Sequence, residues 1–194
     1  MRKSYARMVR MTLRFEVDPE LTEQLRAEII ACWADVSNAG GAVGFVPPVT
    51  MDDVLPRAEA QFAGVRSGRD RLVIGRVAQG EQAGRLAALA FLVGEDFPFT
   101  AHWQTVKRVM VHPDFQGYGY GYRLMAEIAA VARETGLEQL HLDVRGGTGT
   151  DLFYKKCGYN ECGRIPKALK LPGRTHDGSG ATPYRDRIIM ALEL

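Results

Sequence analysis

A glycine-rich turn at residues 116–121, with the sequence Gln-Gly-Tyr-Gly-Tyr-Gly, is the part of this chain best suited to bind a ligand. It lies between an apolar, strand-like run that ends at His112-Pro113 and a helical pattern that starts near Gly119. A turn at a helix N-terminus presents backbone N–H groups to an anion, and the helix dipole adds a positive partial charge. Glycine lets the backbone approach that anion without a Cβ in the way. The turn therefore predicts a phosphate-binding site.

Two common phosphate-binding motifs do not fit this turn. A Walker loop ends in Gly-Lys-Ser/Thr, whereas Gly121 is followed by Tyr122-Arg123. The order Gln-x-x-Gly-x-Gly also differs from the dinucleotide-binding fingerprint. A plain surface turn is the alternative, and the strand and helix patterns on either side argue against it.

The lead-in to the turn, Val-His-Pro-Asp-Phe-Gln at residues 111–116, resembles the pyrophosphate loop of the GNAT superfamily of acyl-CoA-dependent N-acetyltransferases. A second resemblance follows in the strand-like Leu-His-Leu-Asp-Val at 140–144 and the Phe-Tyr-Lys-Lys-Cys-Gly-Tyr at 153–159. Both signatures stand in the order that the family shows, and the resemblance covers roughly residues 85–166.

The resemblance implies that acetyl-CoA is the acyl-donor substrate. It places pantetheine and the thioester oxygen against unpaired backbone groups of the strand before the turn, and the pyrophosphate on the turn itself. The cofactor-binding residues expected on this basis are Val109, Met110, Val111, Gln116, Gly117, Tyr118, Gly119, Tyr120, Gly121 and Tyr122.

Acetyl transfer from a thioester to an amine needs a general base for the amine, an N–H donor for the oxyanion and a general acid for the departing thiolate. By resemblance, Tyr154 holds the position of the general acid near the sulfur, and a phenol is protonated at neutral pH. Asp143, at the end of its strand, is the favoured base. The alternative for Tyr154 is an ordinary half-buried tyrosine. The alternative for Asp143 is a carboxylate that caps the next turn or pairs with Arg145.

One branch of the superfamily, the tabtoxin-resistance acetyltransferases, resembles the chain further. The matching pieces are Gly-Gly-Ala-Val-Gly-Phe at 40–45, Lys-Arg-Val-Met-Val at 107–111 and the run that contains Asp143. That branch is thought to use such an aspartate and tyrosine pair, so the resemblance assigns these roles to Asp143 and Tyr154.

The chain departs from these relatives at two positions. Thr105 stands where the branch has an acidic residue, and Gly147 stands where many superfamily members have asparagine near the start of the helix that carries the tyrosine. His102, Glu95 and Asp96 are the alternative bases.

The rest of the sequence predicts the element order β α α β β β α β α β β. Asp18 and Pro19 are expected to cap and start the first helix, and Thr50 with Asp53 is expected to cap the second.

The predicted strands are 9–17, 71–79, 85–93, 104–111, 138–144, 162–165 and 187–193. The other predicted helices are 119–135 and 147–157, and a long loop is expected over 166–186. The fold class is α/β (α+β), a single domain over residues 1–194 with a mixed, mostly antiparallel sheet flanked by helices. The resemblance adds a splayed parallel pair formed by the fourth and fifth strands.

Composition narrows the function classes. The net charge of +2 is too small to argue for nucleic acid, and no apolar run in the sequence approaches a membrane span. The three cysteines form no Cys-x-x-Cys pair, and no metal site is expected. We expect these cysteines to be reduced thiols in a cytoplasmic protein. The sequence thus indicates an N-acetyltransferase for a small amine, such as an antibiotic or a toxin, and allows for a homodimer. A protein or peptide amine acetyltransferase and a non-catalytic acyl-CoA sensor are the rivals.

Overall fold

A seven-stranded mixed sheet organises the computed structural model, which describes residues 12–171 and 184–194. The strands lie in the order β1-β2-β3-β4-β5-β7-β6, and only β4 and β5 run parallel to each other. The predicted order of helices and strands is confirmed. The strands are β1 Leu13–Val17, β2 Arg71–Val77, β3 Leu86–Val93, β4 Trp103–Val111, β5 Gln139–Arg145, β6 Asn160–Lys170 and β7 Tyr184–Glu193. The helices are α1 Glu23–Asn38, α2 Met51–Arg66, α3 Tyr120–Glu134 and α4 Thr150–Lys156.

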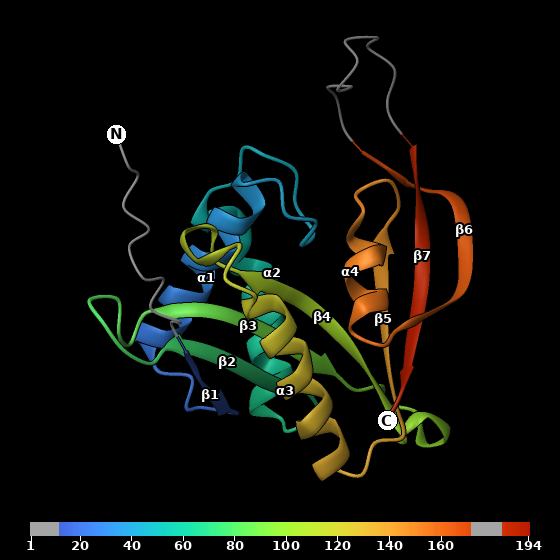
Figure 1. Cartoon of the computed structure of the whole chain (residues 1–194), viewed down its shortest axis with the longest axis horizontal. Helices are drawn as coiled ribbons and strands as arrows, with labels where there is room; N and C mark the ends of the chain where they lie inside the picture. Colours follow the sequence, from blue (N-terminus) through green and yellow to red (C-terminus); the bar gives the residue numbers. More distant parts are fainter. Residues whose placement is uncertain (1–11, 172–183) are drawn as a thin grey trace, which may run out of the picture.

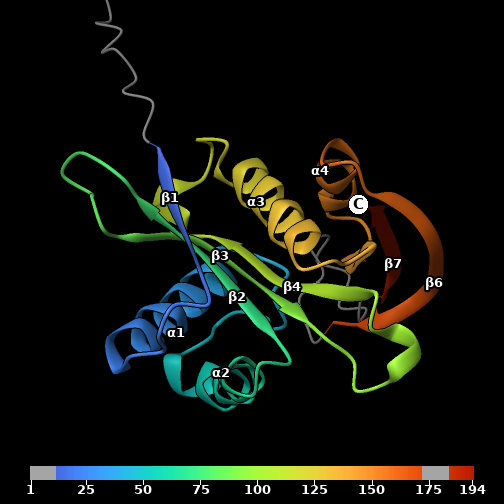
Figure 2. The same ribbon diagram turned by 90° about the horizontal axis from the view of Figure 1, so that it is seen from below.

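Helices cover both faces of this sheet. Figure 2 shows α1 and α2 on one face and α3 with α4 on the other. Each face has its own core: Trp33 and Phe62 lie in the first, and the inward residues of α3, Leu124 and Ile128, lie in the second. The apolar spacing of α3 therefore places its buried stripe as predicted.

The first helix begins later than the sequence predicts. Thr22, rather than Asp18, is the N-cap, and its hydroxyl accepts a hydrogen bond from the Leu25 N–H at 3.2 Å. Asp18 instead adopts a left-handed φ of 47° and binds the N–H of Leu72 and the side chain of Arg71. A long-range partner on β2 thus outcompetes the local capping pattern. The capping box of Thr50 and Asp53 at α2 is confirmed.

The last two strands are longer than predicted. β6 extends to Lys170 and β7 begins at Tyr184, so both reach into the predicted loop 166–186. Residues 172–183 of that loop, and residues 9–11 of the predicted first strand, lie outside the described residues.

The parallel pair separates along its length, as expected. β4 and β5 are paired only where Trp103–Thr105 face Gln139–His141. Further along, β5 remains paired with β7, while β4 carries one extra residue relative to β3 between Lys107 and Met110. Arg108 lies in this β-bulge with a left-handed φ of 55°. A bulge bends its strand, and Figure 1 shows β4 and β5 diverging toward the end where α4 begins.

Two further observations apply to the described part of the chain. None of its helices combines the length and apolarity needed to cross a lipid bilayer. It also holds no group of three or more His, Cys, Asp or Glu side chains that could bind a metal ion. Cys32, Cys157 and Cys162 are free thiols.

Candidate active site

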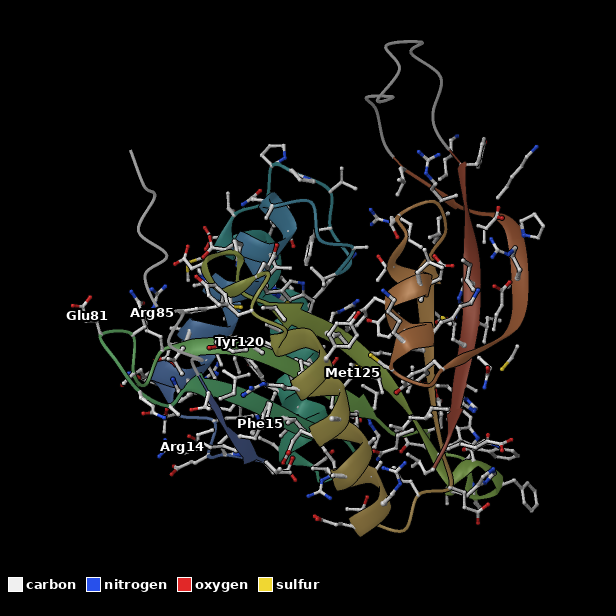
Figure 3. The ribbon with its side chains drawn as sticks, viewed as in Figure 1. Arg14, Phe15, Glu81, Arg85, Tyr120 and Met125 are labelled. Atoms are coloured by element: carbon white, nitrogen blue, oxygen red, sulfur yellow. The ribbon has the colours of Figure 1, made fainter. Side chains whose placement is uncertain are left out.

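The glycine-rich turn forms the N-terminal end of α3, as predicted. Gly117 and Gly119 have left-handed φ values of 82° and 77°, which favour glycine, and Gly119 directly precedes the first helical residue, Tyr120. Figure 3 shows Tyr120 at this end of α3. A Cβ added at Gly117 or Gly119 would meet no atom within 4 Å. The turn therefore leaves room for a ligand against its backbone.

Several N–H groups of the turn are available to that ligand. Within the described residues, those of Gly117, Gly119 and Gly121 donate no hydrogen bond. The Gln116 side chain donates to the carbonyl of Val111 at 3.1 Å, which ties the turn to the end of β4. Free N–H groups at a helix N-terminus form an anion site. The geometry suits a phosphate or pyrophosphate.

A groove leads from this turn into the gap between β4 and β5. It consists of three cavities that share lining residues. The cavity at the turn shares Val111 and Gln116 with a middle cavity of about 460 Å³. The middle cavity shares Val109 and Tyr154 with an inner cavity of about 280 Å³, which Asp143 also lines. The structure thus connects the proposed phosphate site with both proposed catalytic residues.

The expected cofactor-binding residues contribute to this groove in different ways. The side chain of Met110 is buried in the core under α1, so only its backbone could face the groove. Tyr118 is about half exposed and lines none of the three cavities. The others line at least one cavity: Val109, Val111, Gln116, Gly117, Gly119, Tyr120, Gly121 and Tyr122.

Tyr154 is held in the groove by aromatic neighbours. Its ring makes edge contacts with Phe153 and Tyr159, at centroid distances of 5.0 and 5.9 Å. Burial, and to a smaller extent Cys157, raises the pKa of Tyr154 well above its ordinary value. Its hydroxyl has no hydrogen-bond partner among the described residues and can donate into the cavity. The tyrosine is therefore a fixed, protonated phenol.

Asp143 lies on β5 with its side chain on the exposed side of the strand. Its neighbours Leu142 and Val144 are buried on the α3 face. The Asp143 carboxylate forms an ion pair of 2.5 Å with Arg187 on β7, whose pKa it raises. The alternative partner expected from sequence, Arg145, forms no such pair among the described residues. Asp143 borders the inner cavity and also an adjoining hollow that Glu95 and His141 line.

The alternative bases lie outside the inner cavity. Asp96 has a side chain that is 84% exposed and lies 3.8 Å from Arg69. Glu95 lines the hollow that adjoins the inner cavity but not the inner cavity itself, and His102 is exposed on the loop before β4. Thr105 borders both spaces but has no acidic function. Gly147 adopts a φ of 78° beside Arg185, so its backbone conformation favours glycine.

Sequence reasoning missed several groove residues. Phe153 is only partly buried and lines the groove, with its ring centroid 4.9 Å from that of Tyr122. Thr150 lines the middle cavity, and Lys107 and Arg108 line the inner one. Two adjacent cations in the middle of a predicted strand were the available signal for Lys107 and Arg108.

Several known proteins resemble this chain. The family model described as the acetyltransferase (GNAT) domain matches residues 72–161. The [ribosomal protein bS18]-alanine N-acetyltransferase of Haemophilus influenzae is 32% identical over 57 residues. That match covers 29% of this chain and 39% of the relative, so the chain spans well under half of the relative's length.

Solved structures share the fold over nearly the whole chain. The ribosomal-protein-alanine N-acetyltransferase of Brucella melitensis has a TM-score of 0.67 at 19% identity, covering 95% of this chain and 100% of its own. The yncA protein of Salmonella typhimurium, named for acetyltransferase activity and solved with its cofactor acetyl-CoA, has a TM-score of 0.68 at 19% identity. That match covers 95% of this chain and 94% of its own. At these identities the likeness establishes the fold.

Proposed function

We propose that this chain is an acetyl-CoA-dependent N-acetyltransferase of the GNAT superfamily and that it acetylates the amine of a small molecule. The acetyltransferase (GNAT) domain model that matches residues 72–161, and the similar fold of a protein solved with acetyl-CoA, support this proposal. The amine attacks the thioester carbon directly, the C–N bond forms and the C–S bond breaks. The observation that carries this proposal is the continuous groove from the glycine turn to Tyr154 and Asp143.

Each part of the groove has a role in the proposal. The N–H groups of the turn at 117–121 bind the pyrophosphate. The backbone of β4 beyond Thr105, which has no β5 partner in the described sheet, binds the pantetheine and the thioester oxygen. Tyr154 donates its hydroxyl proton to the departing sulfur, and Asp143 accepts the proton that the amine loses.

The finer assignments belong to the same proposal. We place the chain in the tabtoxin-resistance branch because it combines the Asp143 and Tyr154 pair with the loop 40–45. Ala42 and Val43 of that loop line the inner cavity, which supports a role for the loop in acceptor binding. A homodimer stays a prediction.

A protein amine is the second candidate acceptor. It is favoured by the names of two similar proteins, both alanine N-acetyltransferases of ribosomal proteins. The two functions differ in what the acceptor must present: a small molecule enters the cavity whole, whereas a protein inserts only its N-terminal residue. We expect small amines to release CoA faster than a peptide that begins with alanine. The reverse order would favour the protein acceptor, and no release with any amine would favour an acyl-CoA sensor.

Acetyl-CoA should stabilise the folded protein. A ligand that binds only the native state at one hundred times its Kd adds about 2.7 kcal/mol to the free energy of unfolding. Thermal melting with saturating acetyl-CoA, NAD or ATP measures this effect. Acetyl-CoA should raise Tm clearly more than the other two, and a larger shift with NAD or ATP would contradict the assignment.

The Gly119→Leu variant should weaken acetyl-CoA binding at least about tenfold, which corresponds to about 1.4 kcal/mol. The added side chain would fill the open space above the turn, where the phosphate must approach. Calorimetry with acetyl-CoA measures the loss.

Gly136→Leu is the matched control. Gly136 has the same φ of 77° and the same empty surroundings, but it follows the far end of α3. Both variants should lose about 1–2 kcal/mol of stability to backbone strain. Only Gly119→Leu should lose affinity, and equal affinities in the two folded variants would remove the turn from the phosphate site.

A further inference from the structure

We propose that the acceptor amine also carries a carboxylate, and that Arg108, with Arg57 beside it, binds this group in the inner cavity. The inference rests on the proposed function and narrows its acceptor to the class of amino acids and similar zwitterions. Arg108 lines the same cavity as Tyr154 and Asp143, so a bound carboxylate would lie in the space where the amine must react.

The backbone and the packing fix the Arg108 side chain. The residue lies in the β4 bulge with a φ of 55°, a conformation uncommon outside glycine. Its guanidinium stacks over the Trp33 ring at 5.0 Å, and the Trp33 indole N–H is itself bound to the Val43 carbonyl at 2.9 Å. A strained backbone residue with a stacked side chain is typical of a functional position.

Arg108 lacks the counter-ion that a largely buried cation requires. Neither Arg108 nor Arg57 pairs with a carboxylate among the described residues, and the Arg108 Nε is buried there without a hydrogen-bond partner. Burial, followed by repulsion from Arg57, lowers the pKa of Arg108. A ligand carboxylate would neutralise this charge, and a guanidinium binds carboxylates with paired hydrogen bonds.

The loop over the cavity brings the two arginines together. A Cβ at Gly44 would lie 3.1 Å from the Nη1 atoms of both Arg57 and Arg108. Arg57 is held there by the Gly44 carbonyl at 2.6 Å and by stacking on Phe45 at 4.6 Å. The loop thus adds a second cation beside Arg108.

The charge of the inner cavity favours an anionic ligand. Lys107 and Arg108 are both in its lining. Asp143 is the only carboxylate among the described lining residues, and Arg187 already neutralises it. A cavity of this charge disfavours a polyamine. It can bind a zwitterion, with the carboxylate at Arg108 and the amine toward Asp143.

The test compares amino acids with their carboxamides as acceptors. With acetyl-CoA present, CoA release should show kcat/KM at least about tenfold higher for an acid than for its amide. The amine of a carboxamide is less basic, which provides more neutral nucleophile, so this preference cannot come from amine reactivity. Measuring CoA release with a panel of aminophosphonates shows whether the site at Arg108 also accepts a tetrahedral anionic group in place of the planar carboxylate.

Arg108→Gln should abolish the preference, mainly by raising KM far more for the acid than for the amide. Arg57→Gln, at an exposed position, should reduce the preference and serves if the first variant does not fold. Arg164→Gln is the control, because Arg164 is a surface residue paired with Glu161 away from the groove. Equal rates for acids and amides, or a preference that survives in both test variants, would overturn the inference while leaving the acetyltransferase intact.

A binding measurement tests the carboxylate site separately from the proposed acetyltransferase activity. N-acetylglycine, but not N-acetylglycinamide, should raise the Tm of the wild-type protein at matched ionic strength, and Arg108→Gln should remove the difference. If acetyl-CoA binds but no amine is acetylated, the proposed function fails while this shift still tests the carboxylate site. An equal shift from both compounds would contradict the site.

Discussion

Tyr154→Phe is expected to lower kcat by about 10²–10⁴-fold, the range that a general acid contributes. The phenylalanine keeps the edge contacts of the ring with Phe153 and Tyr159 and removes only the hydroxyl. If that hydroxyl acts on the departing sulfur in the transition state, acetyl-CoA affinity should stay nearly unchanged. Steady-state kinetics together with calorimetry measure both quantities. A loss below about threefold would demote Tyr154 to a packing residue.

Tyr159→Phe is a close control for this variant. Tyr159 packs against Tyr154, is 1% exposed, and its buried hydroxyl has no partner among the described residues. It lines none of the groove cavities. Removing its hydroxyl should leave turnover unchanged and should not destabilise the fold, because no hydrogen bond is lost. Similar kinetic losses in both variants would indicate a general packing effect.

The pH dependence adds a second check on Tyr154. Burial raises its pKa above the ordinary value of 10, so the phenol keeps its proton across neutral and mildly alkaline pH. A general acid is active while protonated and fails as the pH rises through its pKa. Activity should therefore show no alkaline decline from this residue below about pH 10. A decline near pH 8 that disappears in Tyr154→Phe would contradict the raised pKa.

The local features of the fold could be predicted from sequence because they depend on neighbouring residues. The capping box of Thr50 and Asp53, the stripe of α3 and the glycine turn before it need only short-range contacts. The start of α1 was predicted wrongly for the opposite reason. Asp18 is a good capping residue in isolation, but Leu72 and Arg71 bind its carboxylate from a distant strand.

In the candidate site, too, features that depend on neighbouring residues could be predicted from sequence, and features that depend on long-range contacts could not. The proposed phosphate-binding turn could be predicted from the spacing of its glycines, since its N–H groups belong to one short segment. The partner of Asp143 could not, because Arg187 is brought beside it by the pairing of β5 with β7. Arg108 escaped notice because its significance depends on the bulge in β4 and on Trp33 and Gly44 from other parts of the chain.

Asp143→Asn is expected to lower kcat/KM by about 10²–10⁴-fold if the carboxylate accepts the amine proton. Asparagine keeps the size of the side chain and can still contact Arg187, but it is not a base. The acidic limb of the pH–rate profile should change as well, because the essential base is gone. Measuring kcat/KM against pH for both proteins tests the two expectations together. A variant that keeps its pH profile and loses only thermal stability would assign Asp143 to holding Arg187.

Asp186→Asn is the matched control for Asp143→Asn. Asp186 lies on the adjacent β7 with a side-chain exposure of 35%, against 38% for Asp143, and it also pairs with an arginine, Arg164, at 3.4 Å. It lines none of the groove cavities, so its variant should keep full turnover.

The double variant Asp143→Asn with Tyr154→Phe joins the two catalytic predictions. Both residues line one cavity. If both serve one reaction coordinate, their combined loss should be smaller than the product of the single losses. Once no proton can leave the amine, a donor for the departing thiolate has less effect. Independent, fully multiplicative losses would mean that the two side chains act at separate steps, and the direct-attack mechanism with this acid and base pair would have to be abandoned.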